Sequence, residues 1–160
     1  MAGATAVGAA TDYLVTQLQP LAAAAVADAL VIDANTNDEH SDSEIWIGRR
    51  GPQDLTAGPG VRGIPVLGTR RVDEEWTIAG FVDCRREGTD QKGSRDPALA
   101  LWDVLCRLVA TDPSLGGVLS SPWYAQLAAA QIEYPDPPQT AASRTVITFG
   151  LKIKNRVLYL

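Results

Sequence analysis

A run of acidic, amide and hydroxyl side chains, DANTNDEHSDSE, has the residue types that bind calcium. Counted from its first residue, oxygen-bearing side chains fall at ligand positions of an EF-hand loop: Asp33, Asn35, Asn37, Ser41 and Glu44. The pattern fails at the sixth position, where Asp38 replaces the glycine of the sharp turn, and the next residues, IWIG, favour a strand. Loops between strands are rich in such residues for turn chemistry alone. We therefore favour a polar turn and keep a small calcium-responsive binding module as the alternative.

His40 and Cys84 have the most reactive side chains, and neither has the neighbours that catalysis needs. His40 is the only histidine, it lies in the same polar loop, and no serine lies in a G-x-S-x-G turn. Arg85 and Arg86 would lower the pKa of the Cys84 thiol, but alternation places Cys84 on the apolar side of a strand, where a thiol is inert. Cys106 lies in a helical pattern and is expected to be a reduced thiol too. We predict no catalytic residue, metal or cofactor, and an unrecognised hydrolase is the last alternative.

Arginines gather in a segment rich in glycine and proline, RRGPQDLTAGPGVRGIPVLGTRR. An irregular segment of this length inside a domain is usually functional or disordered, so we predict an extended arm over residues 49–71. These side chains could contact nucleic acid or the carboxylates of a neighbouring subunit, and because the net charge of the chain is −5 we favour the subunit. A second charged loop follows at residues 87–95. The predicted subunit or partner contacts are Arg49, Arg50, Arg62, Arg70, Arg71, Phe81 and Arg95.

The stretch from Val72 to Arg86, VDEEWTIAGFVDCRR, predicts the long strand around which these segments are arranged. One side of its period-two pattern is apolar and consists of Trp76, Ile78, Gly80, Val82 and Cys84. Phe81 interrupts the polar side. We therefore expect the second face of this strand to be covered at one end, by another layer or by another subunit.

The elements on either side of this strand are two helices and four further strands. The first helix begins after an N-cap at Thr11 or Asp12, and Pro20 kinks it or divides it in two. Its apolar side is expected to carry Tyr13, Leu14, Leu18 and Leu21. The second helix runs over residues 98–110 after an N-cap at Asp96. Strands are expected at 30–33 and 44–48, and a terminal hairpin is expected from the second half of 123–134 and from 144–158.

These elements predict an α+β fold: a single antiparallel or mixed sheet with two helices on one face and a long irregular arm. A chain of 160 residues suits one domain, which we place at residues 11–160 after a flexible N-terminal tail at 1–10. The most apolar run, Leu21 to Ile32, is interrupted by Asp28 and is too short to span a bilayer. The first residues do not form a signal peptide, so we expect a soluble protein that is not secreted.

The order of these segments and their residue patterns resemble those of a known family. The short strand LVID, then EIWIGRRG, the strand EEWTIAGFVDCRREG, the helix DPALALWDVLCRLV and the final SRTVITFGLKIKNRVL occur in that order. Together they resemble the small tail proteins of long-tailed phages of actinobacteria, and most of all lambda-type tail terminators. The resemblance covers residues 11–158 and includes no catalytic motif.

This resemblance implies an assembly role in the virion and no enzymatic reaction. Tail terminators form hexameric rings that cap the tail tube and join it to the head. The implied partners are further copies of the chain, a tail tube protein and a head-side connector, with DNA passing through the ring without sequence-specific binding and with no membrane contact. The implied location is the head-proximal end of the phage tail, after assembly in the host cytoplasm. A head-tail connector or stopper is the alternative within this class.

Overall fold

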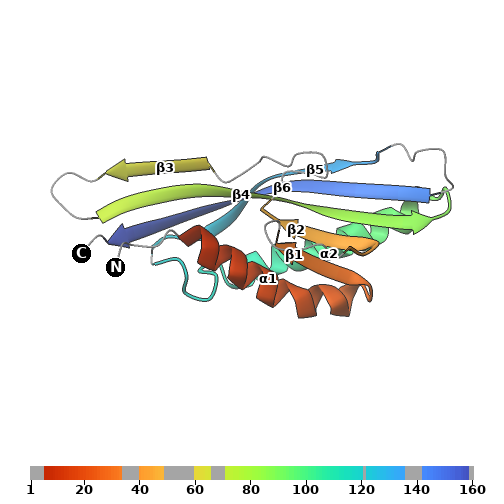
Figure 1. The fold of residues 1–160 in the computed structure, drawn as a ribbon, viewed down its shortest axis with the longest axis horizontal. Coiled ribbons are helices and arrows are strands. Elements are labelled where there is room, and N and C mark those ends of the chain that lie inside the picture. Colours follow the sequence, from red (N-terminus) through yellow and green to blue (C-terminus); the bar gives the residue numbers. More distant parts are fainter. Residues whose placement is uncertain are drawn as a thin grey trace.

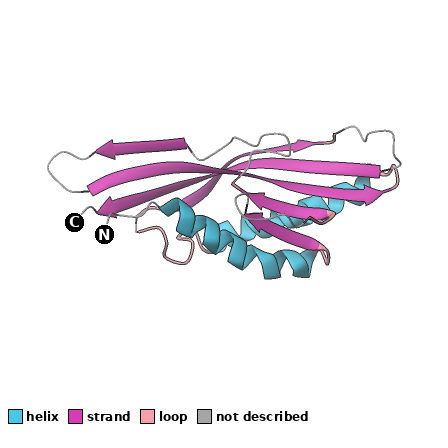
Figure 2. Cartoon of the chain, in the orientation of Figure 1, coloured by secondary structure: helices cyan, strands magenta, loops and turns pink. Residues whose placement is uncertain are grey.

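The computed structural model describes residues 6–33, 40–48, 60–65, 71–120, 122–135 and 142–158. Within these residues, two helices pack on one face of a single six-stranded sheet (Figures 1 and 2). The predicted α+β class with a mixed sheet is confirmed. The helices are α1 (Ala6–Ala25) and α2 (Gln91–Thr111), and the strands are β1 (Ala29–Asp33), β2 (Ser43–Ile47), β3 (Gly60–Pro65), β4 (Arg71–Glu87), β5 (Ala125–Glu133) and β6 (Ala142–Leu158).

Two strands of 17 residues each, β4 and β6, form the centre of the sheet. They pair antiparallel from Arg71 opposite Leu158 to Glu87 opposite Ala142, a length of about 55 Å. The sheet order is β1-β2-β4-β6-β5, and β1 is parallel to β2 while the other pairs are antiparallel. Because β6 occupies one side of β4 along its whole length, β2 and β3 must share the other side, one beyond the other.

Alternation along β4 and β6 separates the two faces of the sheet as the sequence predicts. Ile78, Val82 and Cys84 of β4 are buried towards the helices. The matching residues of β6 are Ile147, Phe149, Leu151 and Ile153. They meet the stripe of α2 formed by Ala98, Leu101, Leu105 and Val109, and the result is one continuous core between the sheet and the helices.

Helix α1 begins earlier than the sequence predicts. Its buried stripe is spaced by four residues and consists of Ala6, Ala10, Leu14, Leu18 and Ala22. The predicted flexible tail is therefore wrong for residues 6–10, and so is the N-cap at Thr11 or Asp12. The Ala6 N–H donates to Glu74 Oε1 at 2.9 Å, so a carboxylate from β4 satisfies an unpaired amide in the first turn and interacts favourably with the helix dipole.

Pro20 does not divide α1, which is one helix from Ala6 to Ala25. Leu18 and Ala22 are fully buried on either side of Pro20, so packing on the sheet holds the helix together across the missing hydrogen bond. This stripe leaves Leu21 exposed, against expectation. Helix α2 also begins before the predicted cap at Asp96, because the Asp90 side chain accepts the Lys92 N–H at the true N-terminus.

Part of the predicted irregular arm is a strand. Residues Gly60–Pro65 form β3 and pair antiparallel with Val72–Thr77 of β4, so the prediction of an irregular arm is wrong for this part. Residues 49–59 and 66–70 lie outside the described residues. The terminal hairpin of β5 and β6 is confirmed, with a register shift between Leu127 and Ala129. We call the end of the sheet formed by Gly60–Pro65, Arg71–Thr77 and Lys152–Leu158 the distal ribbon.

Candidate assembly surfaces

Phe81, predicted to contact another subunit or layer, is buried by its own chain. It is 2% exposed on the face of the sheet opposite the helices, and its ring stacks on that of Trp46 with centroids 5.6 Å apart. Ile32 and Val146 complete this small second cluster. The prediction that Phe81 is a subunit contact is therefore wrong: neighbouring strands of the sheet supply the cover that its apolar ring requires.

A buried ion-pair cluster lies beside these apolar side chains on the same face. Asp83 is 2% exposed and binds Arg144 through both carboxylate oxygens, at 3.0 Å to Nε and 2.7 Å to Nη2. Arg85 adds a contact at 3.1 Å. The hydrogen bond to Asp83 raises the pKa of Arg144, and burial opposes this shift. The bidentate geometry and the second cation compensate a carboxylate that is removed from water.

Glu44, the last residue of the EF-hand-like pattern, also lies in this cluster. Its side chain is almost fully buried, Oε2 accepts the Trp46 indole N–H at 2.7 Å, and Oε1 accepts the Ser41 N–H at 2.7 Å. His40 Nδ1 lies 3.2 Å from the same Oε1. Both carboxylate oxygens are therefore already held by donors within the chain.

The strand register also separates the two ends of the EF-hand-like pattern. Asp33 stands opposite Ile47 in the parallel pair β1–β2, three positions beyond Glu44. An EF-hand needs its first and twelfth residues on one ion, whereas this offset places them about 10 Å apart along the strands. Asn35, Asn37 and Asp38 lie outside the described residues. Across the described part of the chain, no group of three or more His, Cys, Asp or Glu residues is placed to hold a metal ion.

The Glu-x-Trp arrangement of β2 recurs at the opposite end of β4. Glu74 Oε2 accepts the Trp76 indole N–H at 2.9 Å, while its other oxygen binds the first turn of α1. Glu75 points to the opposite face, as its alternation predicts, and lies 3.5 Å from Lys152 and 3.3 Å from Lys154. The hydrogen bond from Lys154 lowers the pKa of Glu75. The distal ribbon thus has an anchored face towards α1 and a charged face towards solvent.

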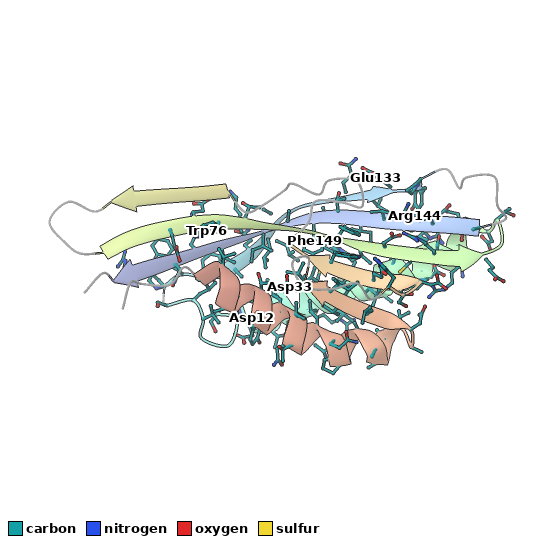
Figure 3. The ribbon with its side chains drawn as sticks, in the orientation of Figure 1. Asp12, Asp33, Trp76, Glu133, Arg144 and Phe149 are labelled. Carbon is teal, nitrogen blue, oxygen red and sulfur yellow. The ribbon has the colours of Figure 1, made fainter. Side chains whose placement is uncertain are left out.

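The predicted arginine contacts that the structure describes, Arg62, Arg71 and Arg95, lie in two different parts of the fold. Arg62 lies in β3 and Arg71 begins β4, so both belong to the distal ribbon. Arg95 lies on α2 instead of in a loop, is partly exposed, and contacts Asp96 at 3.4 Å. Arg49, Arg50 and Arg70 lie outside the described residues. Figure 3 marks Arg144 on β6 at the end of the sheet where Glu133 closes β5, and Trp76 at the opposite end.

The two cysteines do not provide an activated nucleophile. Cys84 is fully buried, and burial raises the pKa of its thiol to about 11 despite the lowering effects of Ser43 and Arg86. Burial also raises the pKa of Cys106, which is partly buried. Both thiols are free. Burial thus favours the neutral thiol of Cys84 over the thiolate at neutral pH.

Sequence reasoning missed Arg144, which binds Asp83, and Gln19 of α1, which hydrogen-bonds to the backbone of β1 at Ala29 and Val31. It gave Glu44 a different role, in the EF-hand-like pattern. The partners of these residues depend on strand register and on the position of α1, which single-strand alternation does not give. The sequence did contain one indication of this cluster. Asp83 and Arg85 fall on the same side of the strand as the apolar Phe81, and a charged group that is buried beside an apolar side chain requires a partner.

The comparisons with known proteins leave the resemblance without independent support. No protein family model matches the chain, and no curated protein matches it. Neither described helix is long and apolar enough to cross a membrane.

Proposed function

We propose that the chain is a tail terminator of a long-tailed phage, a virion structural protein that forms a hexameric ring, caps the tail tube and joins it to the head-side connector. The observation that best supports this proposal is the distal ribbon, which extends beyond the first turn of α1 (Figure 1). Three paired strands there leave the helix-covered core and form a stiff projection. Such a projection is suited to contact another subunit because its backbone is already ordered.

A ring also requires two different contact patches on every copy, because head-to-tail contacts join unlike surfaces. Strand β3 of the distal ribbon and the outer border of the sheet along β5 lie on opposite sides of the central β4–β6 pair, which supports this requirement. One face of the ring would match the last ring of the tail tube, and the other would lack the surface that recruits a further tube subunit. The net charge of −5 would limit adhesion to the phosphates of the passing DNA.

Electron microscopy of phage particles assembled without this chain tests the proposal. Overlong tails are expected, since tube growth would no longer be stopped, and the wild-type chain supplied in trans should restore the length. Tails of normal length together with full heads that leak DNA would overturn the terminator and support the head-tail connector or stopper instead. Infectious particles with normal tails would overturn both.

A further inference from the structure

Strand β5 forms a border of the sheet and is paired on one side only. Its inner side pairs with Val146–Ile153 of β6, and among the described residues no strand pairs with its outer side. Its second half is exposed, including Ala130, Gln131 and Glu133, and Ile132 is 40% exposed. Backbone amide and carbonyl groups on such a border are a template for another strand.

This border has few of the features that usually prevent pairing, and the register shift between Leu127 and Ala129 affects only its first half. The sequence AQLAAAQIE contains no lysine and no proline, and its one charge is Glu133. The border at β1 is different: Gln19 of α1 donates from Nε2 to the Ala29 carbonyl at 3.1 Å and accepts the Val31 N–H at 2.8 Å. One side-chain amide therefore occupies two backbone positions of β1. Among the described residues, the border at β1 is thus partly occupied by a side chain of the same chain, whereas the border at β5 has no pairing strand.

The third border strand, β3, has the direction and charge that complement β5. Strand β5 runs in the same direction as β4, because each is antiparallel to β6, whereas β3 is antiparallel to β4. Copies related by rotation in a ring would therefore bring β5 and β3 together antiparallel, the more stable arrangement. The one charge in GVRGIP is Arg62, and the one charge in β5 is Glu133.

The geometry points to strand addition between copies: we propose that β5 of one chain pairs antiparallel with β3 of the next, so that one sheet continues from copy to copy. This inference rests on the proposed ring. Strand β3 lies level with Val72–Thr77 of β4, and β5 lies level with Trp76–Asp83. Arg62 lies level with Glu75 and Glu133 lies level with Asp83, so pairing these two charges displaces neighbouring copies along the strands by about eight residues, roughly 26 Å. A closed sheet requires such a stagger.

Two exposed apolar residues allow a matched test by sedimentation velocity. Ile132→Lys introduces a charge on the β5 border, and Leu99→Lys introduces the same charge at a position on α2 that is 43% exposed. We expect Ile132→Lys to raise the concentration needed for self-association at least about tenfold, because lysine blocks edge pairing. Leu99→Lys should assemble like the wild type. Glu133→Arg and Arg62→Glu should each weaken assembly, and the two changes together should restore it.

Hydrogen exchange of the unmodified chain gives a second measurement that does not depend on variants. Peptides covering Ala125–Glu133 and Gly60–Pro65 should gain protection as the chain assembles. A wild-type chain that stays monomeric at every concentration, or one whose β5 amides stay unprotected in the oligomer, overturns the edge pairing. Pairing of β5 with tube protein alone overturns it as well. Rings that persist in Ile132→Lys overturn the edge pairing but leave the terminator role intact, which tail length decides separately.

Discussion

At the scale of single residues, Gly80 shows how one missing side chain shapes the core. Gly80 stands opposite Phe149 on β6 and Ile47 on β2. A Cβ on Gly80 would lie 2.5 Å from Cζ of Phe149 and would also collide with the Trp46 carbonyl oxygen. The Phe149 ring thus fills the space over a glycine of the neighbouring strand, and at the same time contacts Trp102 of α2 at a centroid distance of 5.8 Å. The backbone carbonyl cannot move without breaking the β2–β4 pair.

Gly80→Ala should therefore destabilise the protein by about 3 kcal/mol, the upper part of the range for overpacked cores. Gly8→Ala is the matched control, because Gly8 lies on the exposed side of α1 with no atom near its added Cβ. That change should stabilise the helix by about 0.5–1 kcal/mol. Urea unfolding measures both. Equal stabilities for wild type and Gly80→Ala would contradict the close approach of Phe149.

Loss of the ion pair between Asp83 and Arg144 should lower the stability of the protein strongly. Arg144→Gln should cost about 3 kcal/mol, because it removes the bidentate partner of a buried carboxylate and leaves only the more exposed Arg85. Arg107→Gln breaks a pair of similar distance, 2.8 Å to Asp103, on the exposed side of α2. It should cost about 0.5 kcal/mol or less. Similar urea midpoints for the two variants would show that Asp83 is not desolvated.

Single residues also show which parts of the fold can be predicted from the sequence. The alternation of apolar and polar residues was enough to place Ile78, Val82 and Cys84 on the core face, because a strand that is buried on one side carries apolar residues on that side. It misassigned Phe81, because an apolar residue on the polar side of a strand looks the same whether neighbouring strands or another subunit covers it. The stacking partner, Trp46, is nearby only through the β2–β4 register.

At the scale of elements, α1 is held against the turn that follows α2. Tyr13 donates from its hydroxyl to Asp112 Oδ2 at 2.6 Å, and the same carboxylate accepts the Gly116 N–H at 2.7 Å. Leu115, Gly116 and Gly117 all have positive φ, and Leu115 is fully buried. A Cβ on Gly116 would meet the Tyr13 ring at 2.6 Å. The Asp112 carboxylate therefore orders a left-handed turn and joins it to the first helix.

This contact should make stability depend on pH in alkaline solution. The hydrogen bond to Asp112, with burial and the carboxylate charge, raises the pKa of Tyr13 from 10.0 to about 12. The neutral phenol therefore contributes stability that is fully present below pH 10 and is lost as the pH rises to about 12. The Tyr13 hydrogen bond, as the largest of several causes, lowers the pKa of Asp112. The stability that comes from Asp112 is present above its unfolded pKa and is lost as the pH falls through its lowered folded pKa.

Tyr13→Phe tests this dependence. At neutral pH it should cost about 1 kcal/mol, the usual worth of one hydrogen bond, and the difference from wild type should shrink as the pH rises from 10 to 12. Phenolate absorbance should show one tyrosine fewer titrating near pH 12 in the variant. A stability difference that stays constant to pH 12 would contradict the raised pKa. Unfolding in urea at each pH supplies the comparison.

The elements also show where sequence reasoning stops. The cap at Asp96 was wrong because the helix begins with QKGSR, whose weak periodicity hides a helical turn that Asp90 caps. The start of α1 was missed because an alanine stripe is not apolar enough to stand out, although small residues are what allow a helix to approach a sheet closely. Strand β3 was missed because glycine and proline dominate its composition, and pairing with β4 alone makes it a strand.

At the scale of the whole molecule, charge is distributed unevenly between the ends of the central β4–β6 pair. The distal ribbon combines Glu75 with Lys152 and Lys154 on its solvent face, and its strands carry Arg62 and Arg71. At the other end of the sheet the arginines are neutralised by Asp83 and Asp28. If the distal ribbon contacts a neighbouring chain of net acidic charge, its cations should be the part of the contact that salt affects most.

Reversing the charge of Arg71 together with that of Arg70, its neighbour in the sequence, tests that contact. Arg70→Glu with Arg71→Glu should raise the concentration needed for self-association about tenfold at low ionic strength, because the new acidic groups repel an acidic neighbour. The monomer should stay folded by circular dichroism. The matched control is Lys92→Glu with Arg107→Glu, the same change of charge on exposed positions of α2, which should assemble like the wild type.

Salt separates this electrostatic contact from the backbone pairing proposed for β5. At about 1 M ionic strength the Debye length is about 3 Å, so the assembly defect of the doubly reversed variant should largely disappear. The defect of Ile132→Lys should persist, because a lysine at a pairing border interferes with backbone hydrogen bonds as well as with charge. Sedimentation velocity of both variants at low and high salt gives the comparison. Intact rings from the Arg70 and Arg71 variant at low salt would show that this end of the distal ribbon is not an interface.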